Sequence, residues 1–255
     1  LRPEKTIQGE LGLQQQISYN MALDITAYFR DIRDLAGTRS EEITLFGGSA
    51  SYNRLENSDF AYVRGLVLSL SMIETNGFSA SLDYTFQIAK GSASDPQQAR
   101  NAIAGGSLPE IQLTPLDWDQ RNTVNMSLAY DRANWGISGI GQFGSGLPYT
   151  PLSTEDISSL VLNSGKKPLT WNVDLKGYFI PRDGLRLFIR AENIFDRLNP
   201  YTVYDDSGVA DFTRWENIAK SQNTGEPINS ISKWFLNETF YSNPRRIELG
   251  LSYVF

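Results

Sequence analysis

Residues 60–90 read FAYVRGLVLSLSMIETNGFSASLDYTFQIAK, and apolar and polar side chains alternate in this stretch on both sides of Asn76-Gly77. In the second half, one set of alternate positions is apolar: Phe78, Ala80, Leu82, Tyr84, Phe86 and Ile88. The positions between them are polar: Ser79, Ser81, Asp83, Thr85 and Gln87. Because successive side chains of a strand point to opposite faces, the pattern predicts two-faced β-strands. Asn76-Gly77 predicts a tight turn, since both residues tolerate positive φ.

The same alternation recurs along the whole chain and predicts about nine strands. They cover residues 7–17, 21–33, 60–73, 78–90, 120–131, 134–144, 170–180, 184–195 and 245–255. Each is longer than the ~5–6 residues usual in soluble sheets and matches the ~9–11 residues that cross a bilayer at a tilt. No segment has convincing helical periodicity, although residues 95–104 and 154–162 each have room for a short helix.

The connections between these strands alternate in length. Short links fall at 18–20, 74–77, 131–133 and 181–183, and long links fall at about 34–59, 91–119, 145–169 and 196–244. Outer-membrane barrels have short periplasmic turns and long extracellular loops. We therefore predict an all-β fold, a transmembrane antiparallel up-and-down β-barrel in a bacterial outer membrane, with the four long links as extracellular loops.

Composition narrows the classes of function. The chain has 255 residues, a net charge of −6, and neither histidine nor cysteine. This excludes histidine or cysteine metal ligands, thiol nucleophiles and a Ser-His-Asp triad, and no Lys/Arg-rich stretch predicts nucleic-acid binding. No apolar run reaches the ~18 residues of a membrane helix. We expect no enzyme, no cofactor, and no catalytic or metal-binding residue.

Nine strands do not close a barrel by themselves, because bacterial outer-membrane barrels have an even strand number. An open sheet in lipid would leave two edges of unpaired backbone groups. We therefore interpret residues 1–255 as part of a barrel wall whose remainder comes from a missing part of the chain or from another chain.

Several motifs resemble known outer-membrane proteins. The alternating C-terminal stretch, residues 245–255, resembles the last strand of such proteins, which closes on Phe and is read by the barrel assembly machinery. Tyr253 and Phe255 would then form that signal. Further motifs are LRPEKT at 1–6, GELGL at 9–13, DITAYFRDI at 24–32, DWDQR at 117–121, ENIFD at 192–196 and NPY at 199–201. Their order and spacing resemble the barrel of TonB-dependent receptors, in particular Oar-like or carboxypeptidase-regulatory-type members.

The resemblance implies a barrel of about 22 strands around a plug, in which residues 7–17 form the fourteenth strand. The expected partners are outer-membrane lipid, the plug domain and N-terminal strands, the TonB system, and the barrel assembly machinery. The implied function is the barrel wall and the extracellular substrate loops of an active transporter. The alternatives are a non-transporting scaffold or adhesion barrel and a soluble β-sandwich binding module.

Link 196–244 is rich in aromatic residues, which would contact a ligand or partner or pack the loop on itself. They are Tyr201, Tyr204, Phe212, Trp215, Trp234, Phe235, Phe240 and Tyr241. As substrate-loop candidates we select Tyr201, Tyr204, Trp215 and Trp234.

Three other groups have a chemical and a structural interpretation. Asp117 and Asp119 are spaced like paired carboxylates or like rim residues at a strand start. Residues 204–208 read YDDSG, which fits a calcium loop or an ordinary turn. A charge ladder would face the barrel interior, tuning selectivity in a porin or contacting the plug in a receptor. It consists of Asp174, Lys176, Arg186, Arg190, Glu192, Arg246 and Glu248.

Overall fold

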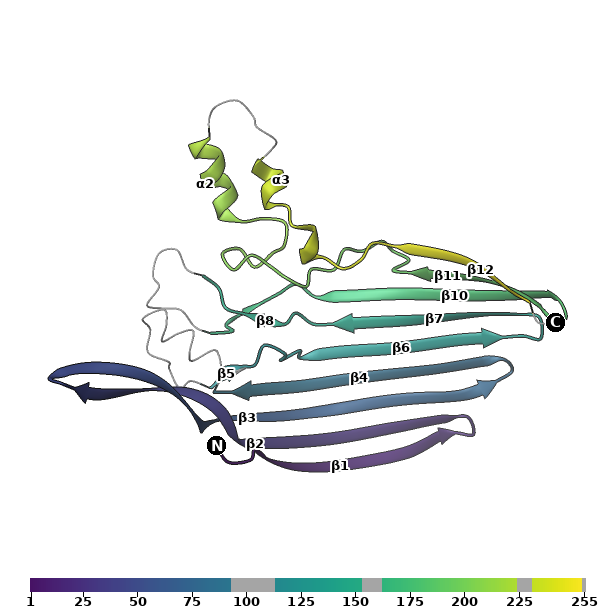
Figure 1. The fold of residues 1–255 in the computed structure, drawn as a ribbon. Coiled ribbons are helices and arrows are strands. Elements are labelled where there is room, and N and C mark those ends of the chain that lie inside the picture. Colours follow the sequence, from purple (N-terminus) through teal and green to yellow (C-terminus); the bar gives the residue numbers. More distant parts are fainter. Residues whose placement is uncertain (93–112, 153–161, 224–230, 254–255) are drawn as a thin grey trace.

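Nine long antiparallel strands lie side by side in one sheet (Figure 1). The computed structural model describes residues 1–92, 113–152, 162–223 and 231–253. The strands are β1 (Lys5–Ser18), β2 (Met21–Leu45), β3 (Gly48–Thr75), β4 (Phe78–Gly91), β6 (Asn122–Asp131), β7 (Trp135–Gly144), β10 (Thr170–Arg182), β11 (Leu185–Glu192) and β12 (Arg246–Tyr253). Each pairs with the next in this order, so all nine predicted strands and their up-and-down arrangement are confirmed.

The long links contain short elements of their own. β5 (Thr114–Pro115) extends the sheet beside β4, and β8 (Pro148–Tyr149) pairs with β9 (Gly165–Lys166). The last long link holds α2 (Arg214–Gln222), α3 (Ile231–Phe235) and the single-turn helix η2 (Glu238–Phe240), none of which we predicted. The two helices proposed at 95–104 and 154–162 fall on residues outside the described ranges, apart from residue 162. Within the described residues, no helix has the length and apolarity needed to cross a membrane.

The two ends of the sheet differ. The short links gather at one end, here called the turn end, and the long links gather at the other, here called the loop end (Figure 1). At the turn end, Asn76 and Gly77 have φ values of 54° and 88°, which confirms the predicted tight turn.

Strand register gives the sheet one apolar and one polar face, because residues directly opposite in neighbouring strands point to the same side. One row runs Leu11, Ala27, Leu66 and Phe86, and belongs to what we call the apolar face. A row of the opposite, polar face runs Gln14, Asp24, Ser69, Asp83, Asn125, Gln142 and Asn172. The apolar face is uncovered, with 79% of Leu11 and 80% of Leu249 exposed. A surface of this kind is stable against lipid and unstable against water.

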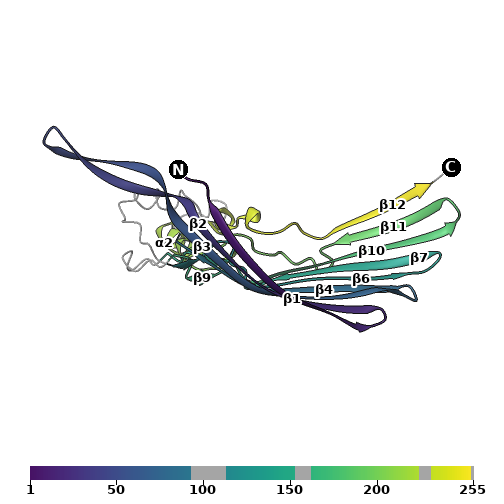
Figure 2. The ribbon, with the colours of Figure 1, turned by 90° about the horizontal axis from the view of Figure 1, so that it is seen from below.

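The sheet is curved but not closed (Figure 2). β1 and β12 are the two ends of the strand order and do not pair with each other. The chain therefore forms an open part of a barrel wall, as its odd strand number predicted.

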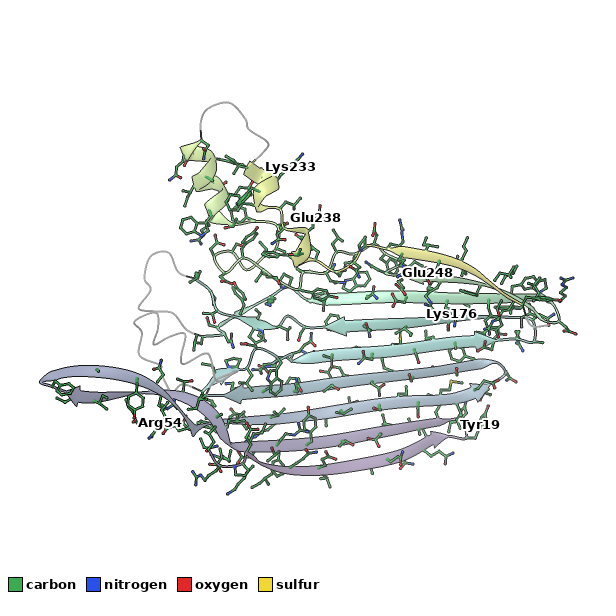
Figure 3. The ribbon with its side chains drawn as sticks, viewed as in Figure 1. Tyr19, Arg54, Lys176, Lys233, Glu238 and Glu248 are labelled. Carbon is green, nitrogen blue, oxygen red and sulfur yellow. The ribbon has the colours of Figure 1, made fainter. Side chains whose placement is uncertain are left out.

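The link predicted as a loop at 34–59 is a β-hairpin instead. β2 and β3 continue past the other strands to a turn at Phe46-Gly47, where φ is 49° and 80° (Figure 1). Arg54, on this projection (Figure 3), lies 2.6 Å from the carboxylate of Glu41. The sequence did not predict this hairpin, because its strands lie beyond the apolar face and therefore lack the alternation of apolar residues.

Candidate functional site

The loop end of the sheet is a continuous surface that begins where the regular strand ladders stop. Between β4 and β6 the paired residues end at Phe86 and Asn122. Beyond them, the Ala89 amide donates to Oδ1 of Asp119 at 2.7 Å, and Oδ2 of Asp119 accepts from Nε of Arg121 at 2.7 Å. Asp119 is fully buried, so its carboxylate takes the place of the missing backbone acceptor.

This geometry decides between the two interpretations of Asp117 and Asp119. Neither lies in a strand, because Asp117 is in a turn and β6 begins only at Asn122, two residues later than predicted. Oδ1 of Asp117 instead accepts from Nδ2 of Asn163 at 2.7 Å. The two carboxylates hold different partners, and this favours the structural role over paired catalysis.

Residues 113–121 fold over the polar face near the loop end. Leu116 is buried there against Ala61, Val63 and Ala89, and register places these three residues on the polar face. The apolar cluster thus narrows the space in front of the polar face at this end of the wall.

Two buried asparagines close the base of the last long link. The Asn199 side chain acts like a peptide group: Oδ1 accepts from the Trp171 amide at 3.0 Å, and Nδ2 donates to the Trp171 carbonyl at 2.8 Å. Nδ2 of Asn193 donates to the carbonyls of Arg197 and Asn243, at opposite ends of the link. The chain enters and leaves the link side by side, so the residues between form a closed loop.

Hydrogen bonds join the long links to one another. Nδ2 of Asn163 donates to the Pro115 carbonyl at 2.8 Å. The Leu152 amide donates to the Asp205 carbonyl at 3.0 Å, and Nζ of Lys167 donates to the Tyr201 carbonyl at 3.0 Å. We call the surface that these links share, over the described parts of residues 113–121, 145–169 and 196–244, the loop assembly.

Three of the four predicted substrate-loop residues are exposed on the loop assembly. Exposure is 61% for Tyr201, 54% for Trp215 and 86% for Trp234. Tyr204 differs: its ring lies 5.0 Å from that of Phe240, and its hydroxyl donates to the Phe235 carbonyl. Burial raises the pKa of Tyr204 above its ordinary value. The structure therefore places Tyr204 inside the packing of the loop.

Sequence reasoning missed other exposed apolar residues of the loop assembly. They include Trp118, Leu152, Leu198, Phe212 and Leu236; Phe212 was counted among the loop aromatics but not selected. An aromatic count identifies the loop but not which side chains point outward, because exposure depends on contacts between links.

The YDDSG segment caps the N-terminus of α2. Oδ2 of Asp206 accepts from the Thr213 hydroxyl at 2.9 Å and from the Arg214 amide at 2.7 Å, and Oγ1 of Thr213 in turn accepts from the Trp215 amide. The amides of a first helical turn lack acceptors within the helix, and carboxylates commonly accept their hydrogen bonds. Within the described residues, no three side chains gather as metal ligands. These contacts favour the structural interpretation over a calcium loop.

The charge ladder lies on the polar face of β10–β12. Arg190 and Glu248 are opposite each other with 3.6 Å between Nη1 and Oε2, and Glu248 also contacts Arg246. The Arg186 guanidinium lies 4.0 Å from the ring centroid of Tyr178. Lys176 and Glu248 come from separate strands of this group (Figure 3). Three of the seven ladder residues, Arg190, Arg246 and Glu248, therefore form ion pairs within the wall, and Asp174 accepts hydrogen bonds from the Asn172 side chain and the Asn193 amide.

The proposed assembly signal is described in part. Tyr253 lies at the turn end on the apolar face, with its ring 5.8 Å from the Arg182 guanidinium. Phe255 lies outside the described residues.

Comparisons with known proteins agree with this geometry. The family model "TonB dependent receptor-like, beta-barrel" matches residues 1–194. No curated protein sequence matches the chain. Among solved structures, the outer membrane transporter YddB from Escherichia coli superposes with a TM-score of 0.63 at 13% identity, over 99% of this chain and 33% of that one.

Two further structures are similar. The ferripyoverdine receptor of the outer membrane of Pseudomonas aeruginosa, bound to ferripyoverdine, has a TM-score of 0.58 at 12% identity, over 99% of this chain and 27% of the other. The FrpB iron transporter from Neisseria meningitidis has a TM-score of 0.54 at 15% identity, over 98% and 31%. The chain thus spans about a third or less of the length of these proteins. The two-faced sheet and the family match together show that this chain belongs to the TonB-dependent receptor-like β-barrel family of the bacterial outer membrane.

Proposed function

We propose that this chain forms the C-terminal wall and the substrate-contacting loops of a TonB-dependent active transporter. The observation that carries the proposal is the arrangement of the sheet. It has an apolar face suited to lipid, a polar face suited to a barrel interior, and long links joined into one assembly at one end. The family match supports the same function.

The loop end faces the outside of the cell in this proposal, and the turn end faces the periplasm. The long extracellular segments are then the hairpin within 34–59 and the links 91–119, 145–169 and 196–244. Their contrast with tight turns such as Asn76-Gly77 supports this orientation.

The remainder of the barrel, the plug domain and the contact with the TonB system belong to the part of the protein outside this chain. The polar face is the surface that would meet the plug. Arg190, Arg246 and Glu248 already form ion pairs within the wall, whereas Lys176 and Glu192 form none among the described residues and would be open to a plug contact. Tyr253 and Phe255 would be read by the barrel assembly machinery.

Exposed aromatic residues of the loop assembly would bind the substrate. Tyr201, Trp215 and Trp234 offer large apolar surfaces with a polar edge, the type of side chain that dominates many binding sites. Iron complexes are the first substrates to test, because two of the similar structures are an iron transporter and a receptor bound to ferripyoverdine.

The test uses cells that carry the full-length protein and radiolabelled ferric complexes. Trp215→Ala combined with Trp234→Ala should weaken binding, since each lost aromatic contact costs about 1–2 kcal/mol, or roughly fivefold to thirtyfold in affinity. Tyr19→Ala is the matched control, because Tyr19 is 77% exposed at the turn end (Figure 3). Equal losses in the control and the double variant would contradict the assignment of the binding surface.

One observation favours the alternative, a non-transporting scaffold. The projecting hairpin of β2 and β3 presents Phe46 fully exposed at its tip, where a partner protein could contact it. Two results together would replace the transport proposal with this one. Substrate accumulation would be unchanged when TonB is deleted, and the Phe46→Ala variant would no longer bind the partner protein.

A further inference from the structure

The projecting hairpin leaves one edge of β2 open. Arg33 is the last residue of β2 that lies opposite β1, and from there the strand continues to Leu45 and pairs with β3. Within the described part of the chain, the backbone of residues 39–45 therefore has a strand on one side only. Such an edge presents alternate N–H and C=O groups that can pair with another strand.

The hairpin also has little packing of its own. Among its described side chains, only Thr38 and Asp59 are buried, and both lie at its base. Toward the tip, Ile43, Tyr52 and Leu55 are 39%, 43% and 53% exposed. An isolated two-stranded hairpin is at best marginally stable in water, whereas three strands are far more stable. A third strand along the open edge would therefore stabilise the projection.

The residues before β1 lie against the base of this hairpin. Asn57 of β3 binds both polar groups of the Arg2 main chain: its Oδ1 accepts from the Arg2 amide at 2.6 Å, and its Nδ2 donates to the Arg2 carbonyl at 2.8 Å. Nδ2 also donates to the Asp34 carbonyl of β2 at 2.6 Å. The Asn57 side chain thus replaces a peptide group between Arg2 and β2, at the point where Asp34 has a φ of 60° and the strand register shifts.

The strand register gives the direction of the chain before β1. β1 is antiparallel to β2 and Lys5 is opposite Arg33, so the residues that precede Lys5 continue toward the hairpin. The N-terminus lies beside the hairpin base in both ribbon views (Figures 1 and 2). Exposed ion pairs support this placement, since Arg2 and Lys5 lie 3.6 Å and 3.9 Å from the carboxylate of Asp34.

We propose that the segment preceding Leu1 in the full-length protein pairs with the open edge of β2 and makes the projecting hairpin a three-stranded sheet. This segment is antiparallel to β2, and its residues lie opposite residues 39–45. Asn57 fixes Arg2 where the added ladder begins. The extracellular link before β1 and the hairpin then project from the wall as one unit. The inference rests on the proposed function only in that a TonB-dependent transporter has barrel strands before this chain.

Disulfide crosslinking in the full-length protein tests this pairing. Residues 1–255 contain no cysteine, so this region adds no competing thiol. One cysteine replaces Ile43 on β2, and the second is moved residue by residue through the segment before Leu1. We expect disulfides at one position or at few neighbouring positions, because adjacent strands lie about 4.8 Å apart and a disulfide needs Cα atoms within about 7 Å.

Ala50→Cys is the matched control. Ala50 lies opposite Ile43 on β3 and is also exposed. A third strand on the β2 side would lie about 10 Å from β3, which is too far for a disulfide. Crosslinks that form as well in Ala50→Cys as in Ile43→Cys, or in neither variant, would overturn the proposal.

Amide hydrogen exchange of the unsubstituted full-length protein gives a second test. A third strand protects successive amides of residues 39–45, whereas an open edge leaves alternate amides unprotected. Fast exchange at alternate residues would overturn the proposal. Successive protection without a crosslink to the segment would mean that a different strand occupies the edge, which would also overturn it.

Asn57→Ala tests how Arg2 is held. Each of the two hydrogen bonds to Arg2 contributes roughly fivefold, so the protected edge amides should exchange about fivefold to thirtyfold faster. Asn53→Ala, at an exposed position of the same strand, is the control and should have a much smaller effect. Equal exchange in wild type and Asn57→Ala would contradict the role of Asn57. Because these measurements need neither substrate nor TonB, their failure would leave the transport proposal intact.

Discussion

Replacing Asp119 by alanine should loosen the junction between β4 and the link that precedes β6. The carboxylate is 0% exposed and satisfies two donors, the Ala89 amide and the Arg121 guanidinium, each at 2.7 Å. Removing one partner of a fully buried ion pair costs about 3–5 kcal/mol. The Arg121 side chain is 24% exposed, so water can solvate it in part. The expected loss is therefore nearer to that of charge-assisted hydrogen bonds, about 2–3 kcal/mol.

Amide hydrogen exchange at Ala89 measures directly the stability that Asp119→Ala removes. A local destabilisation of about 2–3 kcal/mol should speed exchange by roughly 30-fold to 150-fold. Asp119→Asn keeps an acceptor for the amide but loses the charge, and should fall between wild type and alanine. Asp117→Ala is the matched control, since Asp117 lies exposed in the same link and does not contact Ala89. The reasoning fails if Ala89 exchanges equally fast in wild type and Asp119→Ala, or if Asp117→Ala has the same effect.

Three further perturbations follow from local contacts. Asn199→Ala removes two hydrogen bonds to β10 and should destabilise the last long link by about 2 kcal/mol, seen as faster proteolysis within it. The pKa of Glu216 lies below its ordinary value because Lys220 donates a hydrogen bond to its carboxylate. This contact therefore stabilises α2 at pH values above the usual carboxyl pKa. The stabilisation is lost as the pH falls through the lowered pKa of Glu216. Tryptophan fluorescence should show that acid transition, and Glu216→Gln should abolish it. Gly77→Ala should lower the urea midpoint more than Gly47→Ala: both positions have positive φ, but only at Gly77 does an added Cβ meet a backbone oxygen, at 2.2 Å.

Several features of this protein could be predicted from the sequence alone. Alternation with period two located all nine long strands, because the side-chain direction of a strand is a local property. The same alternation assigned residues such as Leu11 and Asp83 to opposite faces, and Asn76-Gly77 located a turn. Strand length and the alternation of short and long links separated a membrane wall from a soluble sheet.

Other features needed the tertiary structure, because they depend on partners far apart in the chain. The role of Asp119 is set by Ala89, thirty residues away, and the role of Asn199 by Trp171. The helices of the last link have no membrane-facing pattern to reveal them. The projecting hairpin is similarly hidden, since apolar and polar residues do not alternate along its strands.

The basic side chains at the loop end of β1–β4 show the same division most clearly. Alternation places Arg33 and Arg64 individually on the apolar side of their strands, but nothing local brings them together with Lys5 and Lys90. Register does so, by aligning four strands whose order in the sheet follows from long-range hydrogen bonding. The sequence by itself therefore determined which residues lie on the apolar face of their strands, and only the tertiary structure decided which of them are neighbours.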